Sequence, residues 1–208
     1  MAHPLNIIEI PALIPKRVVK KIIFADSGVS IEDPLSFDRS VFIPSENISA
    51  FRFGIKGMRF LKFTFCQKYF IELKDYQNKI FRIKLNSYYG ISRKAFFKVW
   101  AELLEHFWNF YMVDQLNFYT ELFDIQQTFE LSGVTFHEDG ISWEGKSKLK
   151  WNQIMINSYQ THFVIQHIND PKQSKCCVFS INWNAVVLQA LLKDIVKRPI
   201  KARKSSWL

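Results

Sequence analysis

The chain has 208 residues, with 28 Lys and Arg against 19 Asp and Glu, so its formal net charge at pH 7 is +9. Hydrophobic residues make up 48% and charged residues 23%, which excludes a wholly disordered or collagen-like chain. No apolar run reaches the ~18 residues that a membrane-spanning helix needs. The length fits one domain or two small ones, and 20 Phe, 7 Tyr and 6 Trp predict an aromatic core.

The first residues of the chain are predicted to form neither a secretory signal nor a helix or strand of the core. Residues 1–16 contain three prolines and are predicted to form an extended N-terminal arm on the surface. They lack the basic start, continuous apolar core and cleavage site of a secretory signal, so we expect a cytoplasmic protein. Cys66, Cys176 and Cys177 are expected to be free thiols, because their number is odd and adjacent strand residues point to opposite faces.

A short pattern occurs twice in the chain. Phe24–Ile31 matches Phe136–Trp143 without a gap: an aromatic residue, an acidic turn, Gly, a β-branched residue, Ser and a large apolar residue. Alternating apolar residues flank both copies, which predicts a β-hairpin in each, with Gly28 and Gly140 at positive φ. The chain is therefore predicted to contain an internal repeat.

The order of the later elements also repeats. Ser45–Ile48 corresponds to Trp151–Ile154, and each segment is predicted to open a new strand. A hairpin then follows in both copies, with its turn at residues 75–78 in the first and 169–174 in the second. The two halves are thus predicted to follow the same chain path.

The first copy differs in length, and both copies end in a helix. An extra strand pair is predicted in the first copy, roughly Asn47–Ile55 and Arg59–Cys66, around a turn at Lys56-Gly57. The apolar period then changes from two to about 3.6, which predicts helices from near Ser92 to Met112 and from Asn184 to Lys197.

Strands first and one helix last, twice over, is typical of an α+β fold. At these residues the chain resembles the bacterial pleckstrin-homology-like (PH-like) domains, which often carry a Gly-apolar-x-apolar hairpin followed by a Trp-x-x-Ile strand entry. The matching segments are Gly140–Trp143 with Trp151–Ile154 and, in weaker form, Gly28–Ile31 with Ser45–Ile48. The resemblance implies two PH-like units, each a curved antiparallel sheet or roll closed by a C-terminal helix.

The repeat also predicts the domain boundaries. The first PH-like unit is expected at residues 17–113 and the second at 129–198. Residues 114–128 carry apolar side chains at helical spacing and are predicted to form a helical linker. Residues 199–208 are predicted to be a basic tail, because Pro199 stops the preceding helix.

The sequence contains no recognisable pattern for catalysis or metal binding. The glycines are scattered and form no phosphate loop, and the five His lack the spacing of a zinc site. No Ser or Cys stands in a known nucleophile motif. We therefore expect a protein that is not an enzyme and binds no cofactor or metal.

Positive charge is the remaining signal. Strand parity predicts that Lys62, Glu72, Lys74, Arg82 and Lys84 share one sheet face, opposite the apolar residues that alternate with them. Three further basic residues are expected near a turn of the same sheet. The predicted partner-binding residues are therefore Arg52, Lys56, Arg59, Lys62, Lys74, Arg82 and Lys84.

Such a face attracts anionic partners. The leading expectation is an acidic-surfaced protein, bound by an adaptor or by an immunity-type protein that neutralises a toxin. Weak docking on an anionic membrane through the basic face and tail is an alternative. The loops that are basic in lipid-binding PH domains are acidic in this chain, however, at Asp26-Ser27 and Glu138-Asp139. Nucleic acid is disfavoured, because most strand aromatics are predicted on the core face. An enzyme with a site between the repeats is the third alternative.

Overall fold

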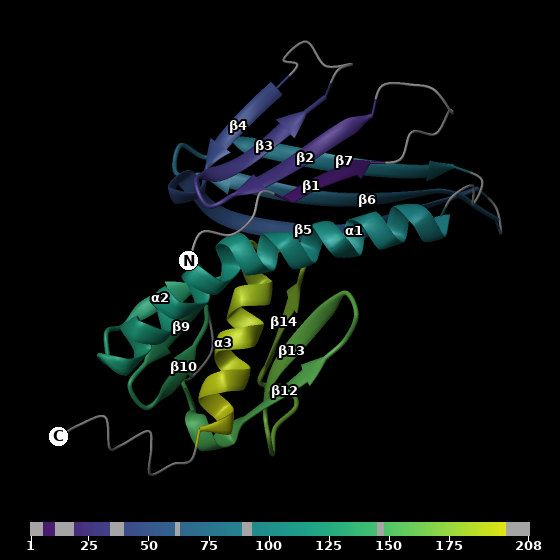
Figure 1. The fold of residues 1–208 in the computed structure, drawn as a ribbon. Coiled ribbons are helices and arrows are strands. Elements are labelled where there is room, and N and C mark those ends of the chain that lie inside the picture. The colour runs from purple at the N-terminus through teal and green to yellow at the C-terminus, as the bar shows by residue number, and fades with distance from the viewer. Residues whose placement is uncertain are drawn as a thin grey trace. The chain divides into compact units, whose positions relative to one another are not determined.

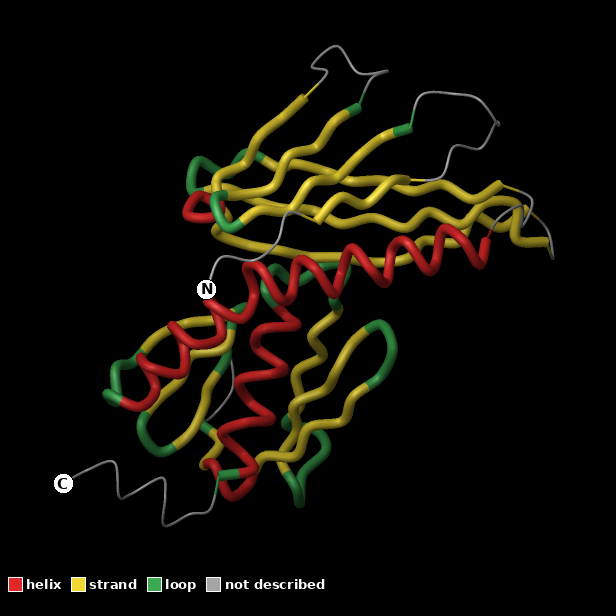
Figure 2. The backbone as a smooth tube through the Cα atoms, in the orientation of Figure 1, coloured by secondary structure: helices red, strands yellow, loops and turns green. Residues whose placement is uncertain are grey.

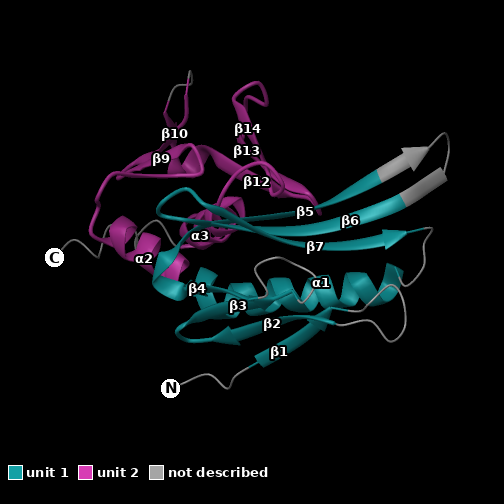
Figure 3. Ribbon diagram, turned by 90° about the horizontal axis from the view of Figure 1, so that it is seen from above, with its two compact units in different colours: residues 1–113 teal, residues 114–208 magenta. Residues whose placement is uncertain are grey.

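The computed structural model describes residues 6–10, 19–33, 40–60, 63–88, 93–144 and 148–198, with no side chains at 58–60 and 63–65. The chain divides into two compact units, Met1–Val113 and Asp114–Leu208 (Figure 3). Both units combine antiparallel sheets with helices, which confirms the α+β class expected from the sequence (Figure 2). The predicted basic tail at 199–208 lies outside the described residues.

The first sheet of unit 1 is an antiparallel meander. It contains β1 (Asn6–Ile10), β2 (Lys20–Ala25), β3 (Gly28–Glu32) and β4 (Ser40–Pro44) in sequence order. The prediction of a surface arm is wrong for residues 6–10, because β1 pairs with β2 and buries Ile8 and Ile10. These two isoleucines alternate with a polar residue, so one face of the strand is apolar and contributes to the core.

The second sheet of unit 1 has three longer strands. A short 3-10 helix, η1 (Ser45–Asn47), leads into β5 (Ile48–Phe60), β6 (Phe63–Asp75) and β7 (Ile80–Tyr88). Gly57 pairs with Gln67 inside the β5–β6 ladder, so Lys56-Gly57 is not a turn and the predicted extra strand pair is wrong. Since glycine accepts extended backbone as readily as a turn, its presence alone did not identify a chain reversal.

Helix α1 (Arg93–Phe107) closes unit 1 and continues into a π-helical turn, η2 (Trp108–Met112) (Figure 1). Its Trp100 packs against Phe53 of β5, with 5.9 Å between ring centroids. Its Phe107 packs against Phe51 of β5 at 5.6 Å and against Phe24 of β2 at 4.9 Å. The helix therefore contacts both sheets, and unit 1 has one aromatic core that includes residues from all three layers.

Unit 2 repeats the order of elements of unit 1, from a four-stranded meander to a final helix. Helix α2 (Val113–Asp124) precedes a meander of β8 (Phe129–Leu131), β9 (Val134–His137), β10 (Gly140–Ser142) and β11 (Leu149–Lys150). A 3-10 helix, η3 (Trp151–Gln153), then leads into β12 (Ile154–Ser158), β13 (His162–His167) and β14 (Ser174–Val178), and α3 (Ala185–Lys197) closes the unit. The predicted start of the first helix and both ends of the last helix agree with the structure within a residue, but the predicted end at Met112 does not, because η2 leads directly into α2.

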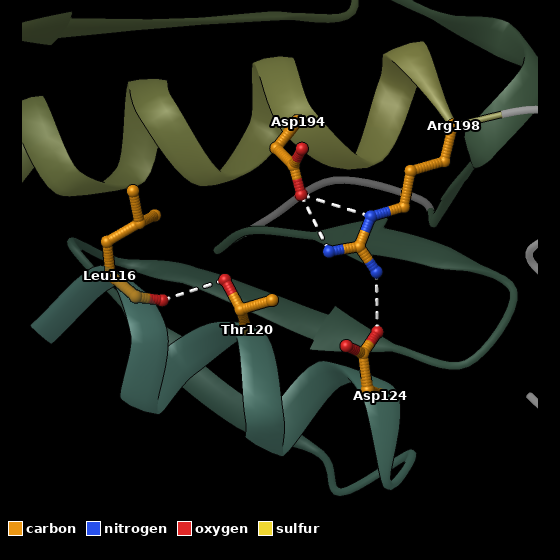
Figure 4. Close-up of polar contacts among 5 residues, drawn as sticks. All are labelled: Leu116, Thr120, Asp124, Asp194 and Arg198. Carbon is orange, nitrogen blue, oxygen red and sulfur yellow. Dashed lines mark hydrogen bonds and ion pairs between the residues drawn. The ribbon is translucent and has the colours of Figure 1, made fainter. Parts of the chain in front are cut away.

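The last helix is anchored within unit 2 by a polar contact. Helix α3 ends at Lys197, because Arg198 precedes a proline and takes an extended conformation. The Arg198 guanidinium donates to Asp194 at 2.7 Å and to Asp124 of α2 at 2.6 Å (Figure 4). Partial burial opposes the charged form, but these two carboxylates outweigh it and raise the pKa of Arg198. The contact joins the C-terminal ends of α2 and α3.

The repeated hairpin has equivalent hydrogen bonds in both units. The residue that opens the 3-10 helix, Ser45 or Trp151, donates its backbone N–H to the second turn residue of the hairpin, at 3.0 and 3.2 Å. The side chain of the same residue donates to the carbonyl oxygen of the first turn residue, Asp26 or Glu138, at 2.9 Å in each unit. Serine and tryptophan thus serve the same purpose at matching positions of the two halves.

The glycines of the two repeated hairpins, Gly28 and Gly140, let the backbones of neighbouring strands approach closely. Gly28 has a φ of +150°, as the sequence predicted, whereas Gly140 does not have a positive φ. At both positions, however, a Cβ atom would overlap a carbonyl oxygen of the next strand, that of Ile43 in β4 or Leu149 in β11. The glycine therefore lets the third and fourth strands of each meander pair closely.

Candidate binding face of the β5–β7 sheet

The β5–β7 register arranges the basic residues in rows across one side of the sheet. Three neighbouring rows run from β5 to β7: Lys56, Lys68 and Asn86; Gly54, Phe70 and Lys84; Arg52, Glu72 and Arg82. A fourth row continues with Ala50, Lys74 and Ile80. We call this side the basic face and define it by Arg52, Lys56, Lys68, Lys74, Arg82 and Lys84.

The other side of the same sheet belongs to the core. Ile71, Leu73 and Ile83 are fully buried there. Tyr69 on this side packs against Trp100 of α1, with ring centroids 5.7 Å apart. Because side chains alternate between the two sides of a strand, packing of the apolar set against α1 directs the basic set away from the helix.

Most of the predicted binding residues share this face. Arg52, Lys56, Lys74, Arg82 and Lys84 all lie on it, together with Glu72. The side chain of Arg59 and the whole of Lys62 lie outside the described parts of the structure.

Lys68 also belongs to the face, although the sequence reasoning missed it. The sequence pattern predicted one strand that ends at Cys66 and a next strand that begins at Tyr69, so Lys68 fell in the connection between them. The structure has a single strand from Phe63 to Asp75. The apolar residues at 69, 71 and 73 have the same parity as Phe63 and Phe65, with only Gln67 between them, and this shared parity was the available signal.

A buried carboxylate links two arginines at the centre of the face. The Glu72 side chain is only 4% exposed. Its Oε2 accepts the Nε–H of Arg52 at 2.5 Å, and its Oε1 accepts the Nε–H of Arg82. A carboxylate at this depth is stable only when it is paired and hydrogen-bonded. The two arginines therefore neutralise Glu72, and the 45% exposed Arg82 still presents positive charge to solvent.

A hollow of about 200 Å³ lies beside this ion triad. The basic side chains of Lys56, Lys68, Arg82 and Lys84 line it together with Phe70 and Asn86. The Lys56 ammonium lies over the Phe70 ring, 5.4 Å from its centroid. A second hollow, of about 490 Å³, is lined by Ile80, Arg82 and Lys84 and by the Lys20–Asp33 ion pair. Arg82 and Lys84 line both hollows.

Outside the basic face, the polar side chains of the described residues form small pairs and clusters. Among the described residues, no group of His, Cys, Asp and Glu is placed to hold a metal ion. In unit 2, His137 Nε2 and Ser142 Oγ lie 2.9 Å apart on neighbouring strands. The Asp139 carboxylate in the adjoining loop pairs with Lys148, and this hydrogen bond lowers its pKa. That acidic loop is thus already paired within the protein.

No protein-family model matches the chain, and no curated protein matches it. No helix in the described parts of the chain is long and apolar enough to cross a membrane.

Proposed function

We propose that this chain is a non-catalytic binding protein built from two PH-like units, and that its basic face binds an acidic surface of another protein. The four-stranded meander, 3-10 turn, three-stranded meander and helix, repeated in both units, support the PH-like assignment. The matching hydrogen bonds of the two hairpins favour duplication of one module over two unrelated halves. Interaction modules of this size act through surfaces rather than through reactive groups.

The observation that best supports the proposal is that the two sides of the β5–β7 sheet carry different kinds of residue. One side packs on α1, and the other gathers six basic residues around one carboxylate that is already paired. Concentrated charge of one sign steers an oppositely charged partner and raises its association rate. The face is therefore suited to an acidic protein surface.

The placement of the aromatic side chains favours a protein over single-stranded nucleic acid. Phe51, Phe53 and Tyr69 lie on the α1 side of the sheet, and Phe70 on the basic face is only 8% exposed. The exposed Tyr88 is the last residue of β7 and lies beyond the rows of basic residues, not between them. Stacking of bases requires exposed aromatic rings between the basic residues. Charge complementarity without stacking fits an acidic protein surface better.

Charge reversal on the face tests the proposal. The double variant Lys56→Glu, Lys84→Glu keeps both arginines paired with Glu72 and should therefore fold. Because it reverses two charges on the basic face, it should no longer capture the partner that the wild-type protein captures from its native host. Lys94→Glu with Lys98→Glu is the matched control, because both lysines are exposed on α1 of the same unit and the charge change is equal. Equal capture by both variants would contradict the proposal. Retention on phosphatidylserine vesicles at low salt, without protein capture, would instead support the membrane alternative.

A further inference from the structure

The basic face contains a like-charged pair that the fold does not need. Lys56 and Lys68 are directly opposite each other across β5 and β6. Like charges at directly opposed positions destabilise a sheet. Neither lysine forms an ion pair with any residue of the described chain, and the same is true of Lys84 in the next row. Three ammonium groups therefore lie around one hollow without a counterion from the described residues.

The hollow has the size and chemistry of a site for one compact anion. Its volume of about 200 Å³ is below the ~300–1,000 Å³ that holds a drug-sized molecule. Phe70 lines it with an apolar surface, and Glu72 adds little repulsion because both of its oxygens accept arginine hydrogen bonds. Asn86 also lines the hollow, and its buried Oδ1 has no hydrogen-bond partner among the described residues. Rotation of that amide would present its NH₂ group in place of the oxygen.

We infer that this hollow binds a single phosphoryl group, carried by a phosphorylated side chain of the protein partner. A phosphoryl group has a charge of about −1.5 to −2 at pH 7 and three strong acceptor oxygens, which matches three lysines better than a singly charged carboxylate does. A carboxylate is bound best by two parallel N–H groups of one arginine, and the Nε–H of Arg82 already binds Glu72. The hollow is therefore less suited to a carboxylate than to a phosphoryl group. This inference deepens the proposed function and depends on its basic face.

Inorganic phosphate is the direct probe. Thermal unfolding of the full chain is compared in millimolar phosphate and in chloride of equal ionic strength, with titration calorimetry for affinity. Lys56→Gln and Lys68→Gln each remove one member of the opposed pair, so both variants should melt at a higher temperature than wild type in chloride. In phosphate the wild type should gain stability, whereas each variant should lose most of that gain and bind phosphate about fivefold more weakly.

Lys79→Gln is the matched control. Lys79 lies over the Phe81 ring at 4.9 Å, as Lys56 lies over Phe70, but it does not line the hollow. This variant should respond to phosphate as the wild type does. An equal response of the Lys56→Gln, Lys68→Gln and Lys79→Gln variants, or no difference between phosphate and chloride for the wild type, would refute the phosphoryl site.

The two proposals fail separately. Suppose that Lys56→Glu with Lys84→Glu abolishes partner capture while phosphate has no specific effect: the proposed function then stands, and the phosphoryl site is wrong. If phosphate binding depends on Lys56 and Lys68 but partner capture is unchanged, the site exists and the proposed function is wrong. Treatment of the captured partner with phosphatase should release it from the wild type, and retention would refute a phosphorylated side chain as the ligand. Binding to phosphatidic acid vesicles but not to a phosphoserine peptide would refute the protein source.

Discussion

Replacement of Trp100 by alanine tests the packing that supports the basic face. The Trp100 side chain is 8% exposed, contacts Phe53 and Tyr69, and its indole Nε1 lies 3.5 Å from the carbonyl oxygen of Phe70. The substitution removes roughly 200 Å² of buried surface, which corresponds to about 5 kcal/mol at ~25 cal/mol per Å². Because an unfolded chain already buries part of this surface, we expect a loss of ~3–5 kcal/mol.

Hydrogen exchange of the full-length protein measures this loss within unit 1. Slowly exchanging amides of β6 should exchange about 100 to 4,000 times faster in the variant, since each ~1.4 kcal/mol is tenfold. Phe97→Ala is the control, because Phe97 is a ring neighbour of Trp100 but is 50% exposed, and it should cost no more than ~1–2 kcal/mol. A loss below about 1 kcal/mol for Trp100→Ala would show that the aromatic core does not support the sheet in this way.

Three further predictions concern other features of the structure. Glu72→Gln should lower the free energy of unfolding by ~2–3 kcal/mol, measured by urea unfolding. The loss is smaller than for a fully buried ion pair because Arg82 is 45% exposed. An unchanged urea midpoint would contradict the ion triad. Burial raises the pKa of the Cys177 thiol from 9.0 to about 11, so the free energy of unfolding should fall as pH rises from about 9 towards 11. In a Cys177→Ser variant that fall should be smaller, and the remainder comes from groups such as Tyr111, whose pKa burial also raises; persistence of the full pH dependence would exclude the thiol as a source. Gly28→Ala and Gly140→Ala should each cost ~2 kcal/mol or more, because the new Cβ meets a backbone oxygen; melting within a degree of wild type would refute the close approach.

Local patterns in the sequence predicted the repeated part of the fold well. The turn residues before Gly28 and Gly140 lie in hairpin turns, and both Ile48 and Ile154 are the first residues of a strand. These features depend on neighbours within about a dozen residues, where alternation and turn chemistry are sufficient.

Features set by tertiary context were not predictable in the same way. Strand β1 was missed because prolines flank it in the sequence, whereas its pairing with β2 depends on a partner farther along the chain. The ion triad required the register that sets Arg52, Glu72 and Arg82 in one row. Strand parity placed Glu72 and Arg82 on one face, but Arg52 was expected only near a turn. Lys56 was predicted in that turn and Lys68 in a connection, so the opposed Lys56–Lys68 pair was also invisible in the sequence.

A hydrogen-exchange footprint of the partner-bound protein tests the basic face most directly. Binding should slow exchange in peptides that cover residues 66–75 of β6 and 80–88 of β7, and added salt should reverse this protection. Protection confined to other elements, such as β1–β4 or α3, with β6 and β7 unchanged, would show that the partner does not bind the basic face.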